Sequence, residues 1–594
     1  MLHLSQAAEA HPVYMAGAVH KEKVKRGKAS RLRKRVAALG VCLVLFGALI
    51  IAVAYILLRN DKAGESTTVG PDTLPSVPEM LRAFMNPDAN PCQNFYSFAC
   101  GSYNNTSGQT LIQIQNDVYV KLVTTLLTVD VPASHQSAAQ KAAALFKTCL
   151  GGIDDTEALT GFLASVGLTA SSYRQAEALD KTLLLFFKYG INTLLGLSLA
   201  EPRVASMQRL ISITMNQQKL QSFLASGNVT ENYYLVNPDA LRYFDRLYGD
   251  LGEEDLSLLT AWELLLVLVP LTSAKAMEVP LFSWHLFSEV PRNTVDASRA
   301  MTQRIKATIL NEIEDSGWLD GGTKWIAINK VNTMGLHVGY PKYFESHREI
   351  DEVYSFLTPW LTAMGKTIEW RMNNHTSFRF SVVVANAYYH LYANKIVIPA
   401  MVMLPPLFVS GNSTALSYGG LGSIVGHEMS HAFDVEGSRF DAEGNVRDWW
   451  TPQARAEYMQ RMACLRQSHG LETDEQDAEN TADFAGLASA YHAYSSLAEE
   501  EKVEGFEFNA EQLFFIASCI KWCATSNVVQ TGRYVPFRER CNVPLKNMEA
   551  FARAFICPAG SPMNPTSRCS FWPHASLRGR LPFEAPFKSR PAER

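Results

Sequence analysis

The stretch Gly426–Asp434, with the sequence GHEMSHAFD, contains residues whose types and spacing could do chemistry. On a helix, His427 and His431 lie four residues apart and point from one face, where two imidazole nitrogens can bind one Zn²⁺. Glu428 would then lie beside the ion, where its carboxylate can take a proton from a water molecule that the metal acidifies. The pattern therefore predicts metal-dependent hydrolysis of a peptide bond, although the same short pattern also arises by chance on ordinary helices.

A catalytic zinc site also needs a third protein ligand and an open position for water. Glu479 and Asp483 are four residues apart on a second expected helix, so they share one face. Glu479 can bind the metal, while Asp483 can hold the tautomer of a zinc-binding histidine from behind, and Asp434 could do the same for the first helix. Acidic residues on a helix are usually solvated, so this pair gains its meaning from the histidine motif.

Helices are expected to form most of the scaffold that positions these residues, because apolar residues recur at spacings of three and four from about 110 to 335 and again from Tyr418. Two runs rich in β-branched residues, Phe378–Val384 and Lys395–Ile398, predict short strands of a small sheet along which an extended peptide could lie. The fold class is therefore mainly α. The expected helices are Leu111–Leu127, Ala138–Leu150, Ala176–Phe187, Ala297–Ile313, Tyr418–Phe433, Pro452–Arg466, Glu479–Ala498 and Ala510–Cys523.

The N-terminal part predicts a membrane anchor. Residues 1–35 hold nine Lys/Arg against two acidic residues, a net charge of +7, whereas the whole chain has a formal net charge of −4. Residues 36–58 carry no charge, and a helix of that length, at about 1.5 Å per residue, spans a hydrocarbon core of about 30 Å. A cleaved signal peptide is the alternative, but the apolar run is longer than a typical signal core. Because positive charge favours the cytosolic side of a membrane, the basic flank places residues 1–35 in the cytosol. Its position beside the membrane explains the positive charge, so nucleic acid is not the expected partner.

The rest of the chain is expected outside the cell. Residues 59–90 are polar and contain Pro, Gly and Ser, which is typical of a stalk, and the folded ectodomain should extend over 91–594. Nine of the ten cysteines lie beyond the span, near the two ends of this ectodomain, which suggests disulfides between its first and last segments and one thiol left over. Five sequons fit glycosylated surface loops: Asn104, Asn105, Asn228, Asn374 and Asn412.

Ordered motifs along this ectodomain resemble those of a known family. They include PCQNFYSFACG at 91–101, NAYY at 386–389, GHEMSHAFD at 426–434, DWW at 448–450, ENTAD at 479–483 and GSPMNP at 560–565. The chain resembles the neprilysin and endothelin-converting-enzyme family, the M13 zinc endopeptidases. The resemblance implies a type II protein of the plasma membrane with two mainly helical lobes. These would be an outer lobe at about 110–335 and a thermolysin-like (gluzincin) catalytic lobe with a small β-sheet at about 375–572.

The resemblance also implies roles for individual residues. His427, His431 and Glu479 would bind one Zn²⁺ per chain, Glu428 would be the general base, and Asp483 would support the site. Other residues match positions that hold the substrate: Asn386 and the backbone of Ala387 for its main chain, Arg540 near its subsites, and Val402, Leu407, Ile424 and Trp522 in a hydrophobic pocket. Each of these four apolar residues could equally be ordinary core. The expected activity is hydrolysis of extracellular peptides on the amino side of hydrophobic residues.

The implied disulfides are Cys92–Cys557, Cys100–Cys523 and Cys464–Cys569. Two further cysteines, Cys519 and Cys541, stand where the family usually has none, and they could bond each other. The stretch between Cys149 and Trp318 is shorter than the corresponding part of the family's outer lobe, which puts the usual selection of small peptides in doubt.

A second departure concerns the catalytic machinery. Where the family has a histidine that stabilises the oxyanion, six residues before the arginine matched by Arg540, this chain has Tyr534, and Gly532 replaces a nearby aspartate. The loss of one oxyanion donor typically lowers the rate about 10²- to 10³-fold. An alternative function is therefore a catalytically weak or inactive homologue that acts as a binding or scaffold protein.

Overall fold

The computed structural model describes residues 77–137, 290–340, 384–409, 413–497, 507–526, 528–530 and 532–572, with short pieces between 140 and 198 and at 234–235 and 260. The basic tail 1–35, the apolar run 36–58, most of the stalk and most of the expected strand Phe378–Val384 lie outside these residues, as do Cys149, Asn228, Asn374 and Asn412. Asn104 is exposed and Asn105 half-buried in a turn. In the described part of the chain, no helix combines the length and apolar character needed to cross a membrane.

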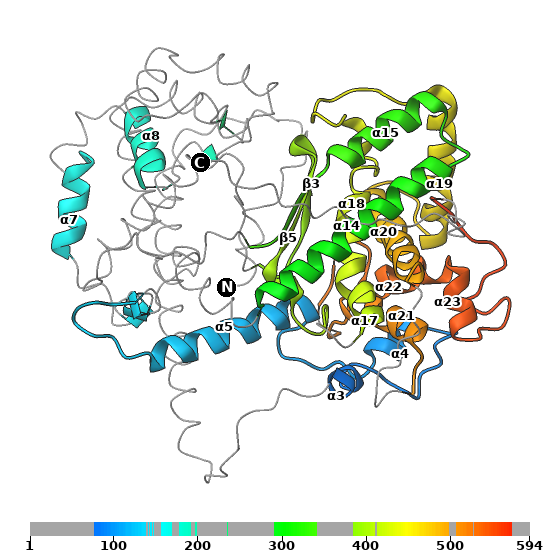
Figure 1. Cartoon of the computed structure of the whole chain (residues 1–594), viewed down its shortest axis with the longest axis horizontal. Helices are drawn as coiled ribbons and strands as arrows, with labels where there is room; N and C mark the ends of the chain where they lie inside the picture. The colour runs from blue at the N-terminus through cyan, green and yellow to red at the C-terminus, as the bar shows by residue number, and fades with distance from the viewer. Residues whose placement is uncertain are drawn as a thin grey trace, which may run out of the picture. The chain divides into compact units, whose positions relative to one another are not determined.

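The described structure is mostly helical, as expected (Figure 1). The N-terminal helices are α3 (Val77–Arg82), α4 (Phe95–Cys100), α5 (Thr110–Thr128), α7 (Thr156–Ser165) and α8 (Ala178–Tyr189), and β1 (Leu197–Ser198) pairs with β2 (Tyr234–Leu235). The helices that follow are α14 (Arg292–Asp315), α15 (Gly321–Thr333), α17 (Thr414–Ser417), α18 (Ser423–Ser430), α19 (Pro452–His469), α20 (Asp477–Ser495), α21 (Ala510–Ile520), α22 (Phe537–Lys546) and α23 (Glu549–Ala554).

One expected helix, Tyr418–Phe433, differs from the expectation in its first turn and in its end. It begins with a π-helical turn over Tyr418–Gly422, directly after α17, and continues as α18, which ends at Ser430. Glycines in the turn allow two very close backbone contacts: a Cβ on Gly419 would lie 2.1 Å from Phe514 O, and one on Gly420 would lie 2.3 Å from Leu407 O. A regular amphipathic pattern does not encode such contacts, so periodicity alone could not predict the wider turn.

A three-stranded sheet lies beside these helices (Figure 1). Its central strand β5 (Lys395–Pro399) is fully buried. It pairs in parallel with β3 (Gly335–Gly339) and antiparallel with β4 (Tyr388–His390). The sequence predicted β5 but missed β3, which is short and has glycine at both ends, features that weaken a strand signal. β4 is an edge strand, and both Asn386 and Ala387 directly precede it.

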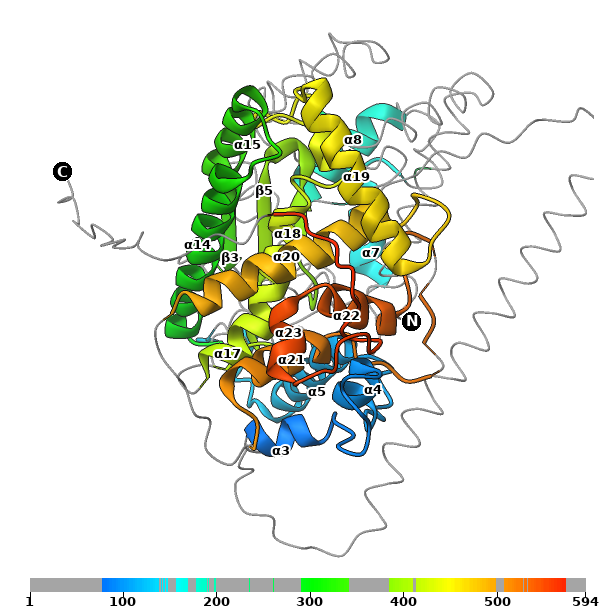
Figure 2. The same cartoon turned by 90° about the vertical axis from the view of Figure 1, so that its right-hand side faces the viewer.

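The helices α18 and α20 are in close backbone contact and lie side by side in Figure 2. A Cβ on Gly426 would lie 2.2 Å from Gly486 O, and a Cβ on Gly486 would lie 2.3 Å from the backbone nitrogen of His427. Any side chain larger than hydrogen would therefore push the helices apart. The contact occurs one residue before the first histidine of the motif, so it sets the distance between the two helices where the candidate ligands are.

The described residues contain four disulfides, two of which join the start of the described chain to its end. Three of them are the pairs that the family resemblance implied: Cys92–Cys557, Cys100–Cys523 and Cys464–Cys569. The fourth, Cys519–Cys541, joins α21 to α22 across a sequence separation of 22 residues. Cys519 and Cys541 are 0% and 2% exposed, so this bond lies within the core.

The fourth disulfide should contribute measurably to stability. In the chain-entropy model, a loop of this length contributes about 3 kcal/mol to the free energy of unfolding. We expect the double variant Cys519→Ala/Cys541→Ala to lose about that amount in chemical denaturation of the ectodomain under non-reducing conditions. Free thiols at both positions in the native protein, detected by alkylation and peptide mapping, would contradict the bond.

Candidate metal centre

The three candidate metal ligands come together from two helices. His427 lies on α18, His431 caps its C-terminal end, and Glu479 lies in the first turn of α20. The Nε2 atoms of the two histidines are 3.0 Å apart. Glu479 Oε2 lies 3.4 Å from His427 Nε2 and 4.0 Å from His431 Nε2. Residues 52 positions apart in sequence thus direct their donor atoms to one point.

This donor set fits a zinc ion. Two imidazole nitrogens and one carboxylate oxygen are the protein ligands of a catalytic zinc with one open position, and donors about 2.0–2.1 Å from a tetrahedral ion are about 3.3 Å from one another. The observed separations lie around that value. Four carboxylates (Glu428, Asp434, Glu479 and Asp483) and two guanidinium groups (Arg533 and Arg540) lie in and around the ligands.

Two buried carboxylates orient the histidines from behind. His427 Nδ1 lies 2.8 Å from Asp483 Oδ1, and His431 Nδ1 lies 2.5 Å from Asp434 Oδ2. A carboxylate at Nδ1 holds the proton on that nitrogen, so that Nε2 is left to bind a metal. Asp434 itself is fixed because its Oδ1 accepts the backbone N–H groups of Glu436 and Gly437 at 2.8 and 2.6 Å.

Two arginines hold the acidic side of the site. Arg540 donates to Asp483 at 2.6 and 2.9 Å and to Glu479 at 3.4 Å, and Arg533 Nη2 lies 2.9 Å from Glu479 Oε1. Burial opposes the charge on Glu479, but hydrogen bonding to His427 and the nearby positive charges lower its pKa to about 2. Burial also opposes the charge on Asp483, yet Arg540 and His427 hold the pKa of that carboxyl well below its usual range. Both carboxylates therefore stay ionised at neutral pH.

Among the four carboxylates of the site, Glu428 is the one that neither belongs to the ligand set nor orients a histidine, so it is available for proton transfer. Its side chain is 5% exposed, and burial raises the pKa of its carboxyl, against the opposing effect of the two histidines. Within the described residues its carboxylate makes no hydrogen bond, so its oxygens remain available to an incoming proton donor. A raised pKa moves a carboxylate towards the operating pH, where a base is most effective.

The residues predicted to hold substrate lie in different environments. Asn386 is exposed and Ala387 is buried, next to the edge strand β4. Val402 and Leu407 are 0% exposed and belong to the hydrophobic core, whereas Ile424 and Trp522 are partly exposed at its border.

Tyr534 lies at the border of the charged cluster. Its ring centroid is 5.0 Å from the guanidinium carbon of Arg540 and 5.8 Å from that of Arg533, and the residue is 37% exposed. Burial and the negative charge of Glu479 raise the pKa of Tyr534 to about 12. Its hydroxyl therefore keeps its proton at neutral pH and can donate a hydrogen bond.

Comparison with known proteins agrees with this geometry. Residues 386–571, which include every ligand and carboxylate described above, match the model of peptidase family M13. This segment is therefore similar to that family over its whole matched length. The resemblance to neprilysin and endothelin-converting enzymes is thereby confirmed.

Relatives of this chain include Neprilysin-1 of Caenorhabditis elegans, which is 32% identical over 317 residues, and endothelin-converting enzyme 1 of Bos taurus, 29% identical over 325 residues. The matched parts cover 47% and 49% of this chain but 42% and 43% of those proteins. The chain therefore matches less than half the length of these curated relatives.

Solved structures share the fold at low sequence identity. The zinc metalloprotease Zmp1 of Mycobacterium tuberculosis superimposes with a TM-score of 0.57 at 17% identity and covers 83% of this chain and 99% of its own. PepO from Lactobacillus rhamnosis gives a TM-score of 0.55 at 18% identity, over 80% and 98% of the two chains.

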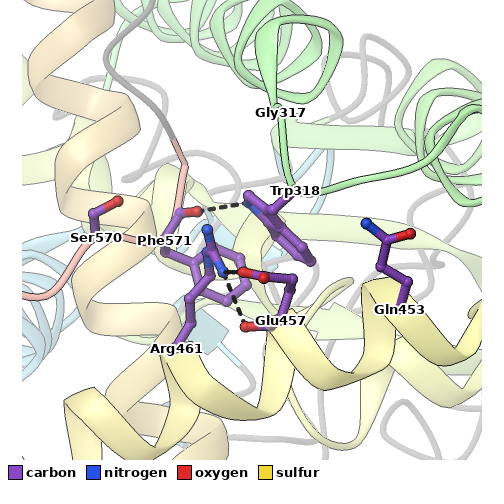
Figure 3. A pocket seen from close by; sticks show the side chains of 7 residues that line it. All are labelled: Gly317, Trp318, Gln453, Glu457, Arg461, Ser570 and Phe571. Atoms are coloured by element: carbon purple, nitrogen blue, oxygen red, sulfur yellow. Dashed lines mark hydrogen bonds and ion pairs between the residues drawn. The ribbon is translucent and has the colours of Figure 1, made fainter.

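A cavity of about 340 Å³ lies elsewhere in the M13 fold (Figure 3). Its lining residues are Gly317, Trp318, Gln453, Glu457, Arg461, Ser570 and Phe571. Arg461 donates to Glu457 and lies over the ring of Trp318, so the charged groups of this cavity largely satisfy each other. It shares no residue with the metal centre, and its chemistry suggests no catalytic role.

Sequence reasoning missed three cations near the centre: Arg533, Lys330 and Lys521. Arg533 carries no pattern that distinguishes it from a solvated arginine. Lys330 did leave a signal, because it lies on the same face of α15 as the buried residues Thr323, Ala327 and Val331, where an apolar residue is normal. Lys521 directly follows the wholly buried run Leu513–Ile520.

Lys330 is fully buried and holds the turn that follows the metal-binding helix. Its ammonium donates to the backbone carbonyls of Ala432, Gly437 and Phe440 at 2.9, 2.6 and 2.7 Å. Burial lowers the pKa of Lys330 to about 7, while two nearby aspartates oppose that shift. The turn it holds contains Asp434, which orients His431, so Lys330 is a positioning residue for the metal centre.

We expect Lys330→Met to weaken zinc binding by about 10- to 100-fold, the range seen when outer partners of metal ligands are removed. The measurement is chelator competition on the folded ectodomain. Lys395→Met is the matched control, because Lys395 is also nearly fully buried, at 2% exposed, but lies on β5 away from that turn. Equal zinc affinities for the two variants would contradict the positioning role, even if both lose stability.

Proposed function

We propose that this protein is a membrane-anchored, zinc-dependent endopeptidase that hydrolyses extracellular peptides. The observation that carries the proposal is the convergence of His427, His431 and Glu479 with an unbonded, buried carboxylate, Glu428, directly beside them. The apolar run 36–58 would anchor the chain in the plasma membrane in type II orientation, with the catalytic domain outside the cell and an outer helical lobe beside it.

The proposed reaction needs one ion and a small set of side chains. A zinc ion held by the three ligands supplies Lewis acidity, which acidifies water and polarises a peptide carbonyl. Glu428 takes the proton of the attacking water on its carboxylate and delivers it to the nitrogen of the leaving amine. Asp434 and Asp483 keep the histidine Nε2 atoms directed at the metal position throughout. The hydroxyl of Tyr534 donates a hydrogen bond to the oxygen on which negative charge develops.

The substrate would be an extended peptide. β4 is the edge strand nearest to α18, and the exposed side chain of Asn386 with the backbone of Ala387 would bind the substrate main chain beside it. Ile424 and Trp522, which keep exposed apolar surface, would receive the residue on the carboxyl side of the cleaved bond, so that cleavage falls on the amino side of hydrophobic residues.

A second candidate function is a zinc-binding M13 homologue with little activity that serves as a binding or scaffold protein. The specific observation in its favour is Tyr534, since a neutral phenol supplies less electrostatic stabilisation than a cationic donor.

Glu428→Gln should abolish most turnover without removing the metal. General-base catalysis contributes about 10²- to 10⁴-fold, so we expect kcat to fall by at least about 10²-fold on a quenched hydrophobic peptide. Zinc content, measured by mass spectrometry, should be unchanged because Glu428 is not a ligand. Glu443→Gln, an exposed glutamate in the loop after α18, is the control and should leave kcat as it is. Undiminished activity of Glu428→Gln would contradict the mechanism.

Variants of Tyr534 separate the two candidate functions. If the native protein is an active peptidase, Tyr534→Phe should lower kcat by about 10²-fold and change KM little, because the hydroxyl acts in the transition state. The scaffold function predicts the opposite pattern: negligible native turnover and a large gain in Tyr534→His. Steady-state kinetics of the three proteins on one peptide decides between them.

A further inference from the structure

Lys521 is a buried cation whose hydrogen-bonding capacity is not filled. The residue is 6% exposed, and its Nζ donates to Ser423 Oγ at 2.6 Å. In the described part of the chain this is its one hydrogen bond, although an ammonium has three donors. Lys330 shows the contrast, since it is equally buried but donates to three carbonyl oxygens. Two donors of Lys521 are therefore left for another acceptor.

The position of Lys521 connects it directly to the metal centre. Ser423 is the first residue of α18, four residues before the first ligand histidine. The Nζ atom of Lys521 lies 5.0 Å from the ring centroid of Trp522, and the same ring carries the guanidinium of Arg540 at 3.9 Å. Arg540 in turn contacts the carboxylates of Glu479 and Asp483. A continuous series of contacts thus leads from the spare ammonium donors to the metal ligands.

A buried ammonium with two unused hydrogen-bond donors is energetically unfavourable, so we expect an acceptor to bind it. Burial of a charged group is unfavourable unless hydrogen bonds and opposite charge compensate, and an apolar residue here would pack without that cost. Burial lowers the pKa of Lys521 to about 7, and the negative charges of Asp483 and Glu428 only partly oppose that shift. Neither carboxylate makes a hydrogen bond to the ammonium in the described part of the chain, and Asp483 is bonded to Arg540 instead. An acceptor that arrives with a ligand would use the two spare donors.

We infer that Lys521 Nζ binds the side-chain carboxylate of an acidic substrate residue, the one on the carboxyl side of the cleaved bond. This inference rests on the proposed function, in which Ile424 and Trp522 receive that residue. A glutamate fits both features, because its methylene groups can lie against these two apolar side chains while its carboxylate reaches the ammonium. Of the residues whose apolar groups Ile424 and Trp522 could receive, Glu is therefore preferred, and a purely hydrophobic residue at the same place is cleaved more slowly.

The test uses three quenched peptides that differ only at this residue, which is Glu, Gln or Leu. The zinc-loaded ectodomain should cleave the Glu peptide with a kcat/KM about 10- to 100-fold above that of the Gln peptide, the range of a hydrogen bond between buried charged groups. Lys521→Met should abolish that ratio and make Leu the preferred residue. Lys521→Arg, which keeps the cation, should retain a preference for Glu over Gln.

The ratio between peptides is measured within one protein preparation, so a lower folded fraction of Lys521→Met does not affect it. Lys395→Met, the buried lysine on β5, should keep the native ratio. The inference is overturned if the native protein cleaves the Leu peptide best, or if the Glu to Gln ratio is the same in Lys521→Met.

Failure of the proposed function would give a different result. If no peptide is cleaved, the endopeptidase proposal fails, and binding of the same three peptides, measured by fluorescence anisotropy, decides the inference by itself. Tighter binding of the Glu peptide that is lost in Lys521→Met would support a carboxylate site on a non-catalytic protein. Equal binding of all three would refute it.

Discussion

The backbone contact between α18 and α20 is the constraint on which the metal centre depends. Gly426 and Gly486 let the two helices approach until the carbonyl of one faces the Cα of the other. The histidines on the first helix and Glu479 on the second can then reach a common point without any flexible linker. A site built in this way is stiff, because moving one ligand means moving a helix whose other side is packed in the core. Two glycines that have no side chain to bind a metal or a substrate thus decide whether the ligands meet.

The concentration of buried charge is the second feature of the site. Four carboxylates and two arginines lie in and around the ligands, and each charged group is paired or lies next to an opposite charge. Such a network is expensive to bury and contributes little net stability. It does fix geometry, because each carboxylate that orients a histidine is itself held by an arginine or by backbone N–H groups. The structure therefore uses charge to specify positions rather than to increase stability.

The sequence predicted the parts of this centre that follow a local pattern. The spacing of His427 and His431, and that of Glu479 and Asp483, requires only the period of a helix, and both pairs meet as that period implies. Residues whose role depends on the packing of distant segments were missed. Lys330 and Lys521 act through contacts with carbonyls or side chains about a hundred positions away, and β3 pairs with a strand sixty residues further along the chain. No local periodicity encodes such partners, although a lysine on an apolar helix face does mark that some partner must exist.

The long-range disulfides have a consequence for the covalent integrity of the molecule. Cys92 and Cys100 near the start of the described chain are bonded to Cys557 and Cys523 near its end. A single cut by a protease anywhere between Cys100 and Cys523 would therefore leave two fragments that remain joined by at least two bonds. The nicked protein would keep its full mass until it is reduced, and α4 would stay attached to the helices that carry the metal centre. A protein built in this way can tolerate cleavage of an exposed loop without losing its N-terminal segment.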